Sequence, residues 1–490
     1  MLRYRSFAVI SLLAFSLSAC TSRDTTAADA AAQAQLELQQ GRVADASRSI
    51  HKAISIHDDV SEYWMILGKI DADMEDYSGA FTAYENALGL DRANVEALRA
   101  LCQFGIAAGF PDKVDKYADQ LLLMSPGDSL PTVAKGQAAL ARGDQAGALK
   151  YAEQVLKTAP QDSSAQILKA RVLGARGSYS DAAEFIEATL GAGGDDSSKL
   201  IYLKGLYTEA RDRPHYQLTL KRLAEAKPNA PAVQIDYADM LYQTGQPDQA
   251  NALIIKIVHA HPNNVGVAAS ILDTWLKEGA DAITPSQIRN QSASASLQMK
   301  AAYAQFASEA GHPELVDGIL KAALWGKPIS TEHTDAQSAL AYAMGLMGQR
   351  PAAIGRLSKI IEFDSSQPQA LLARARLFMN DKDYGHAIED ARNAVAQDPK
   401  NALARITLAD ALFAHGDESL GENALREGVR VLPADTRLAA RLATFLAAKG
   451  QRDRASEVLR DLTRASPVSL RALRLRQTLD PASVAEAARQ

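Results

Sequence analysis

Few residues of this 490-residue chain have the type and spacing that catalysis or metal binding requires. The nine histidines are scattered, and none stands in the HExxH arrangement that binds zinc on a helix. His259 and His261 are spaced to chelate a metal, but no cysteine or acidic residue lies next to them to complete a site. We therefore predict no metal site, no cofactor and no enzymatic activity.

The candidate nucleophiles and phosphate loops are also incomplete. Serines of the segment 285–296 lack the glycine elbow of a serine hydrolase. The glycine-rich run at 191–194 lacks the lysine and the Ser/Thr that follow in a phosphate-binding loop. Cys102 falls at a small-residue position and is expected in a helical core. These patterns favour binding over catalysis.

A different cysteine, Cys20, follows a segment typical of export signals. Arg3 and Arg5 precede an apolar run from Phe7 to Phe15, which is too short to span a bilayer as a mature helix. The sequence then reads Leu-Ser-Ala-Cys at 17–20. This motif resembles the lipobox of bacterial lipoproteins, in which the signal is removed before the cysteine and that cysteine is acylated.

The resemblance implies a signal peptide over 1–19, lipidation of Cys20 and a lipid-anchored tether over 20–34. An ordinary signal peptide cut after Ala19 is the alternative. Thr21 stands where lipoproteins kept at the inner membrane tend to carry aspartate, so in a cell with two membranes the expected place is the outer membrane, facing the periplasm.

Composition narrows the partner class. The formal charge is −5 and the pI is near 6.0, which argues against a nucleic-acid partner because such partners need a strongly basic face. Hydrophobic residues make up 47% of the chain and aromatic residues 6%. Much of the apolar share is alanine, which suits closely packed helices.

The chain is organised around a repeating unit, seen most clearly in Ser61–Asn94. Two short helices with markers such as Trp64, Gly68 and Tyr84 flank a turn near Glu75. This 34-residue pattern resembles the tetratricopeptide repeat. The resemblance implies an all-α, right-handed superhelical solenoid of about thirteen helix-turn-helix units, some of them degenerate.

The phase of the pattern defines the expected organisation. An N-terminal array covers 27–264. A C-terminal array covers 297–469 and contains three extra residues, 331–333, after its first unit. Between them, 265–296 is a degenerate repeat, a hinge between two sub-arrays, or a longer loop in one continuous solenoid. The arginine-rich residues 470–490 are expected to form a capping helix, with leucines covering the last unit and arginines facing water.

In the repeat family, the first helix of each unit lines a concave groove. The second, fifth, ninth and twelfth positions of each unit therefore predict a fairly apolar, peptide-binding groove with sparse positive charge. Packing within or between units is the alternative for several of them. The candidates are Met65, Lys69, Arg99, Val133, Ile167, Arg171, Ile201, Ile235 and Tyr242 in the first array, and Tyr342, Leu372, Arg376, Met379, Ile406 and Phe413 in the second.

The predicted function is a non-catalytic, lipid-anchored scaffold that binds protein or peptide segments of the cell envelope. Lipoproteins of this architecture resemble scaffolds of exopolysaccharide export, which is slightly preferred because those arrays are long, and of pilus or secretin assembly. An adaptor that recruits a cell-wall hydrolase or protease is the hypothesis from a different class. The sequence does not define the oligomeric state.

Overall fold

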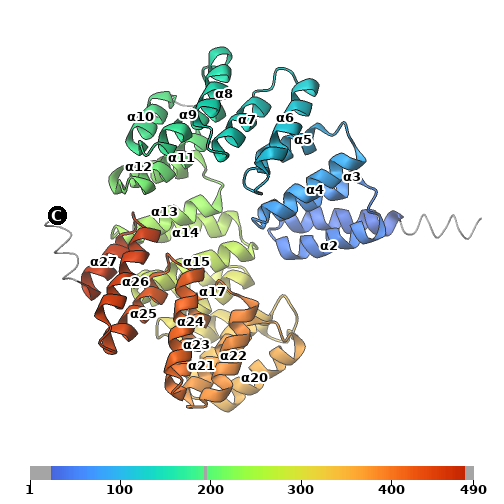
Figure 1. Cartoon of the computed structure of the whole chain (residues 1–490). Helices are drawn as coiled ribbons and strands as arrows, with labels where there is room; N and C mark the ends of the chain where they lie inside the picture. The colour runs from blue at the N-terminus through green and yellow to red at the C-terminus, as the bar shows by residue number, and fades with distance from the viewer. Residues whose placement is uncertain (1–23, 192–195, 481–490) are drawn as a thin grey trace, which may run out of the picture. The chain divides into compact units, whose positions relative to one another are not determined.

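The computed structural model describes residues 24–191 and 196–480. These residues confirm the predicted all-α fold, since they form helices joined by short connections and contain no strand. The chain divides into two compact units, unit 1 (Met1–Leu206) and unit 2 (Tyr207–Gln490). Successive helices pair antiparallel within each unit, as a helix-turn-helix repeat requires (Figure 1).

Unit 1 begins, within the described residues, with a helix over 24–39. The helices that follow are α2 (Val43–Ile56), α3 (Ser61–Asp73), α4 (Tyr77–Leu90), α5 (Val95–Phe104), α6 (Pro111–Met124), α7 (Leu130–Ala141), α8 (Gln145–Thr158), α9 (Ser163–Ala175), α10 (Tyr179–Thr189) and α11 (Ser197–Glu209), the last of which runs across the division between the units.

Unit 2 continues the same arrangement. Its helices are α12 (Arg213–Ala226), α13 (Pro231–Gln243), α14 (Pro247–Ala260), α15 (Val265–Glu278), η1 (Ala280–Ala282), α16 (Pro285–Ala293), α17 (Leu297–Glu309), η2 (Pro313–Leu315), α18 (Val316–Leu324), α19 (Thr334–Leu346), α20 (Arg350–Phe363), α21 (Pro368–Asn380), α22 (Tyr384–Gln397), α23 (Ala402–His415), α24 (Glu418–Val431), α25 (Thr436–Ala448), α26 (Arg452–Ala465) and α27 (Leu470–Leu479).

The turn between paired helices has a consistent local chemistry. In the α7–α8 pair, Gly143 adopts a positive φ of 85°, a region that glycine enters without steric strain. Asp144 then caps α8 by accepting a hydrogen bond from the backbone N–H of Gly147 at 2.8 Å. Three pairs place a residue with a side chain at the positive-φ position instead, namely Glu75, Arg211 and Lys382.

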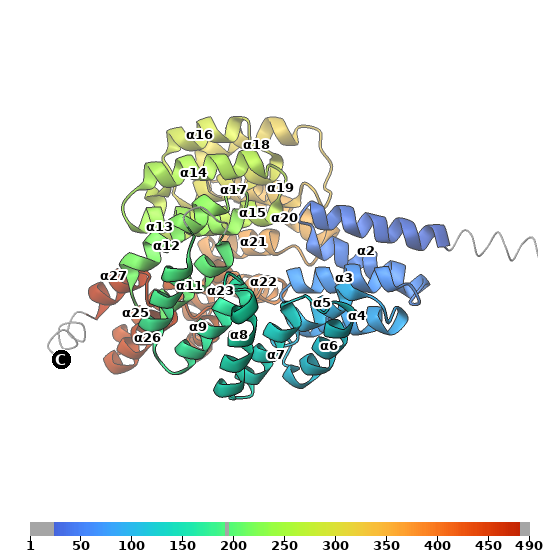
Figure 2. The same cartoon turned by 90° about the horizontal axis from the view of Figure 1, so that it is seen from above.

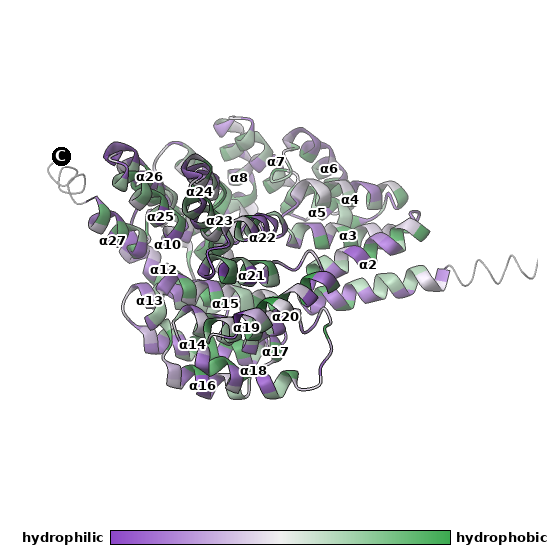
Figure 3. Cartoon of the chain, turned by 90° about the horizontal axis from the view of Figure 1, so that it is seen from below, coloured by the Kyte–Doolittle hydropathy of each residue, from purple (hydrophilic) through white to green (hydrophobic). Residues whose placement is uncertain are grey.

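Small residues let the paired helices approach closely. A Cβ added to Gly68 of α3 would lie 2.7 Å from the ring of Tyr84 in α4, so that ring packs directly on the glycine backbone. Several helices, such as α26, carry hydrophobic and hydrophilic residues on different sides (Figure 3). The apolar sides form core clusters that pass from one repeat to the next, which is how a solenoid buries surface without a single central core.

The segment 265–296 is a helical repeat unit inside unit 2. Its α15 contributes Trp275, which is fully buried with ring centroids 5.0 Å from Tyr303 and 5.6 Å from Phe306 of α17. The same core cluster extends continuously from Ile235 to Ala343. The division between compact units falls at 206/207, and the buried tryptophan anchors the segment 265–296 to the repeat that follows.

The N-terminal expectation needs a correction. Residues 24–34 are helical, whereas the tether was predicted to extend to residue 34. Ala27, Ala30, Ala31 and Ala34 recur at helical spacing and are buried, the last three in a cluster with residues of α2. The signal peptide and Cys20 lie outside the described residues. No helix in the described ranges is both long and apolar enough to cross a bilayer.

Candidate functional site

The predicted groove positions of unit 1 divide into exposed and buried side chains. Lys69, Arg99 and Arg171 are exposed, and Arg99 forms an ion pair with Asp128 at 2.6 Å. Ile201 of α11 is 53% exposed, which is a high fraction for an isoleucine. Ile167 is half-buried, whereas Met65 and Val133 are buried and belong to core clusters. Four of these positions are therefore exposed, and one of the four, Arg99, is already paired within the chain.

In unit 2 the predicted positions lie deeper. Ile235, Tyr242, Tyr342 and Leu372 are buried, and Met379, Ile406 and Phe413 are half-buried. Tyr242 is wholly internal, because its hydroxyl donates to Asn251 Oδ1 at 2.6 Å and accepts from Trp275 Nε1 at 3.1 Å. For Tyr242, packing between repeats therefore replaces the predicted groove role.

The predicted positions of unit 2 nevertheless border real hollows. Tyr342, Leu372 and Arg376 line a narrow cleft of about 20 Å³ between α17, α19 and α21. Ile235 lines a larger hollow of about 740 Å³, whose walls come from α13, α15, α23 and α25 among others. Gln305 and Gln369 border both spaces. Several first helices of the repeats in unit 2 thus line a shared interior.

Arg376 is the most constrained charge on this surface. Its guanidinium forms an ion pair with Glu309 of α17 and lies 5.0 Å from the ring centroid of Tyr342. Burial lowers the pKa of Arg376 to about 10, which still leaves it charged at neutral pH. Nearby, desolvation raises the pKa of Asp335, although a hydrogen bond with Gln367 opposes the shift. The charge at the narrow cleft is therefore already paired within the chain.

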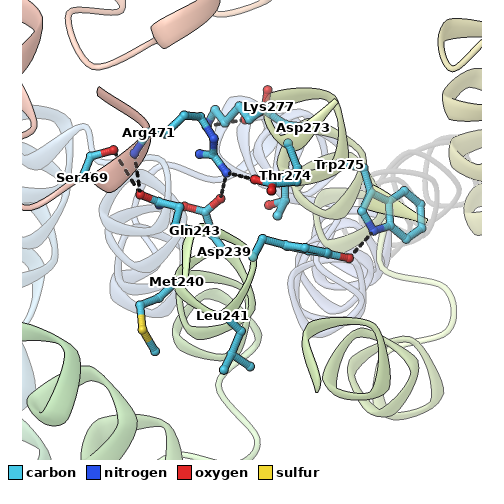
Figure 4. A network of polar contacts seen from close by, with 12 residues as sticks. Asp239, Met240, Leu241, Gln243, Asp273, Thr274, Trp275, Lys277, Ser469 and Arg471 are labelled. Carbon is cyan, nitrogen blue, oxygen red and sulfur yellow. Dashed lines mark hydrogen bonds and ion pairs between the residues drawn. The ribbon is translucent and has the colours of Figure 1, made fainter. Parts of the chain in front are cut away.

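A polar network joins the end of unit 2 to its earlier helices (Figure 4). Arg471 of α27 contacts Glu278 at 2.8 Å and Asp239 at 3.0 Å through Nη2. Its backbone N–H donates to Gln243 Oε1 at 3.3 Å. Arg437 of α25 reaches Asp273 of α15 at 2.7 Å. We call these residues the closing network, because they join the last helices of unit 2 to α13 and α15.

The closing network corrects the prediction for the capping helix. Ala472 is buried and Leu475 packs against α25 and α26, so α27 does cover the last repeat. Arg471, however, does not face water. Its side chain is only 17% exposed, and the carboxylates of Asp239 and Glu278 compensate its charge. Figures 1 and 2 agree in placing α27 beside α13.

Sequence reasoning missed the charged residues of this interior, although the same positional rule finds most of them. Asp239 and Asp273 occupy the ninth positions of their repeats, and Arg437 and Arg471 occupy the second positions of theirs. Glu309 occupies the thirteenth position of its repeat, which the rule does not include. The charged residues at groove positions could thus be read from the sequence, but the ion pairs between distant repeats could not.

Two other candidates from the sequence have unremarkable surroundings. Cys102 is fully buried, and desolvation raises the pKa of its thiol to about 12, so it stays protonated. His259 lies in the last turn of α14 and His261 follows it as the C-cap. Among the described residues, no group of three or more His, Cys, Asp and Glu is placed to hold a metal ion.

Comparison with known families agrees with this geometry. The model described as "Tetratricopeptide repeat" matches residues 133–197 in unit 1 and 372–435 in unit 2. These segments are tetratricopeptide repeats. The first segment covers the α7–α8 and α9–α10 repeat pairs, and the second covers α21–α22 and α23–α24. Each half of the chain therefore contains recognised repeats, and repeats of this kind typically bind other proteins.

Solved structures resemble the chain only distantly. Yeast Tom70 has 13% identity and a TM-score of 0.34, with 92% of this chain and 99% of that chain covered. PilF of Pseudomonas aeruginosa has 19% identity and a TM-score of 0.29 over 42% of this chain and 94% of that chain. The pilus biogenesis factor PilW has 16% identity and a TM-score of 0.31, covering 41% and 94%. These scores are too low to support an argument about partners. No curated protein matches the sequence.

Proposed function

We propose that this protein is a lipid-anchored, non-catalytic scaffold of the cell envelope, which holds segments of partner proteins along the groove face of its repeats. The observation that carries the proposal is the combination of a lipobox-like Leu-Ser-Ala-Cys at 17–20 with a tandem array of interaction repeats. Acylation at Cys20 would hold the array at a membrane, because two or three acyl chains anchor a protein stably.

The groove face of unit 1 is the better partner surface. Ile201 offers exposed apolar area, and Lys69 and Arg171 form no ion pair with any other described residue. In unit 2, by contrast, Arg376, Arg437 and Arg471 already pair with carboxylates of the same chain. A partner segment therefore displaces fewer existing contacts in unit 1. Its expected chemistry is an extended or helical peptide with apolar anchors and some acidic residues.

The envelope machine we favour is an exopolysaccharide export system, because the array is long. Pilus or secretin assembly and recruitment of a cell-wall hydrolase or protease are the alternatives, and they predict different partners. Crosslinking in membranes followed by mass spectrometry distinguishes the three. Export components, pilus or secretin components, or peptidoglycan enzymes would each identify one of them.

The test of the anchor compares the native protein with Cys20→Ala. Incorporation of labelled palmitate and recovery in the membrane fraction should both be lost in the variant. If Cys20→Ala stays acylated and membrane-bound, the anchor proposal is wrong. If acylation is lost but the same partners are still crosslinked, the groove alone defines the function.

The test of the groove uses a matched pair of substitutions. Ile201→Ser on the groove face should abolish crosslinking to the partner, whereas Leu218→Ser on α12, which has the same 53% exposure, should not. Both residues are exposed, so circular dichroism should show unchanged helicity in both variants. Equal crosslinking by the two variants would exclude the groove face around Ile201 as the partner site.

A further inference from the structure

A separate pocket lies in unit 2 beside α18, α19 and α20. Its volume is about 540 Å³, and its apolar floor includes Leu340 and Met344 of α19 and Ile360 of α20. Leu340 belongs to the core cluster that surrounds Trp275, whereas Ile360 belongs to the next cluster along the chain. The pocket therefore opens where two core clusters meet, which gives it a preformed apolar base.

An exposed tryptophan borders this pocket. Trp325 follows the last residue of α18 and is 80% exposed, whereas Trp275 is fully buried. It begins the connection to α19, which contains the three extra residues 331–333 that break the repeat spacing. A large aromatic side chain left in water at the edge of a pocket is typical of an interaction site, and tryptophan is enriched among residues that dominate binding energy.

The pocket carries an excess of positive charge. Lys327, Arg356 and Lys359 are exposed on its lining, and none of them has an ion-pair partner among the described residues. Lys321 also lines the pocket but is paired with Asp317 at 3.0 Å. Three uncompensated cations around an apolar floor complement a ligand that combines carboxylates with an apolar anchor.

This pocket is distinct from the groove interior, although both involve α19. Leu340, Met344 and Met347 recur at helical spacing and line the pocket. Ser338 and Tyr342 lie on another side of the same helix and line the narrow cleft of the interior. The two surfaces therefore use different residues of one helix.

We propose that the pocket beside Trp325 is a second docking site, which binds an acidic segment of a partner protein through an apolar anchor residue. The anchor packs against Trp325 and the floor at Met344, and flanking carboxylates meet Lys327, Arg356 and Lys359. A concave pocket favours an inserted peptide side chain over the flat surface of an anionic bilayer. This site goes beyond the groove face around Ile201 and does not depend on it.

The test uses synthetic peptides and the full-length protein. The probe is a labelled 15-residue peptide in which phenylalanine and leucine are interspersed with aspartate and glutamate; in its counterpart, lysine replaces the acidic residues. The acidic peptide should bind, shift the emission of Trp325 to shorter wavelength and dissociate with added salt. Trp325→Ala, and separately Lys327→Glu combined with Lys359→Glu, should each weaken binding about tenfold or more.

Matched controls make the outcome decisive. Leu123→Ala changes an apolar residue of α6 that is 83% exposed, and Lys221→Glu reverses an exposed charge on α12, so neither should alter the affinity. Equal binding of the acidic and lysine peptides, no binding of the acidic peptide, or unchanged affinity of Trp325→Ala would each overturn the proposal. So would vesicles of phosphatidylglycerol that shift Trp325 emission and displace the peptide.

Discussion

Replacing Arg471 with alanine should loosen the end of unit 2. The guanidinium of Arg471 lies between Asp239 and Glu278, and the three side chains are 17%, 27% and 26% exposed. Removing one partner of a fully buried pair costs about 3–5 kcal/mol, whereas an exposed pair contributes about 0–1 kcal/mol. The partial exposure places Arg471→Ala between these limits, at about 2 kcal/mol, because two carboxylates are left facing each other without a counter-charge.

Hydrogen–deuterium exchange of α27 measures this loss directly. If α27 opens 2 kcal/mol more easily, its protected amides should exchange about 30-fold faster. The matched control is Arg464→Ala on α26, whose 71% exposed side chain pairs only with Asp461 one turn away and should change little. Glu278→Gln should show a smaller effect than Arg471→Ala, because Arg471 keeps Asp239. Equal exchange of α27 in Arg471→Ala and Arg464→Ala would refute the energetic role of the closing network.

Three further changes test the repeats and their charges. Gly68→Ala should lower the stability of unit 1 by about 1–3 kcal/mol in a denaturant melt, because its Cβ would stand 2.7 Å from the ring of Tyr84; an unchanged midpoint would contradict that packing. Lys382→Gly should raise stability by about 1 kcal/mol, because Lys382 has a φ of 61°, and a lower midpoint would show that its side chain matters more than its backbone. Burial would raise the pKa of Asp273, but the nearby cations, Arg437 first, outweigh burial and hold this pKa below its usual range. The ionised carboxylate should therefore stabilise the fold fully above about pH 4, and this stabilisation should disappear as the pH falls further. Asp273→Asn should be less stable at pH 7 and lack this part of the acid sensitivity in thermal melts; an identical pH profile would exclude the pair as its source.

The repeat fold was predictable because its signals are local. Turn residues such as Gly143, capping residues such as Asp144 and small residues such as Gly68 act within one helix pair, so a single unit of sequence defines them. Whether the side chain at a groove position is exposed or buried was less predictable. Whether Tyr242 lines a groove or packs inside depends on Asn251 and Trp275, which belong to neighbouring helices.

The contacts of the closing network depend on the geometry of many successive repeats. Each repeat is rotated slightly relative to the one before, and these small rotations add up along the solenoid. Whether α27 returns to α13 is therefore a property of the summed curvature, and no single repeat encodes it. The sequence shows Arg471 and Asp239 at groove positions, but 232 residues separate them.

The segment 265–296 shows why a weak repeat signal is a poor guide to structural importance. Its polar composition dilutes the pattern, yet Asp273 and Glu278 of α15 accept the arginines of α25 and α27, while Trp275 on the same helix anchors the core. Because those carboxylates are already paired, a basic partner entering the hollow of unit 2 must compete with Arg437 and Arg471 for them.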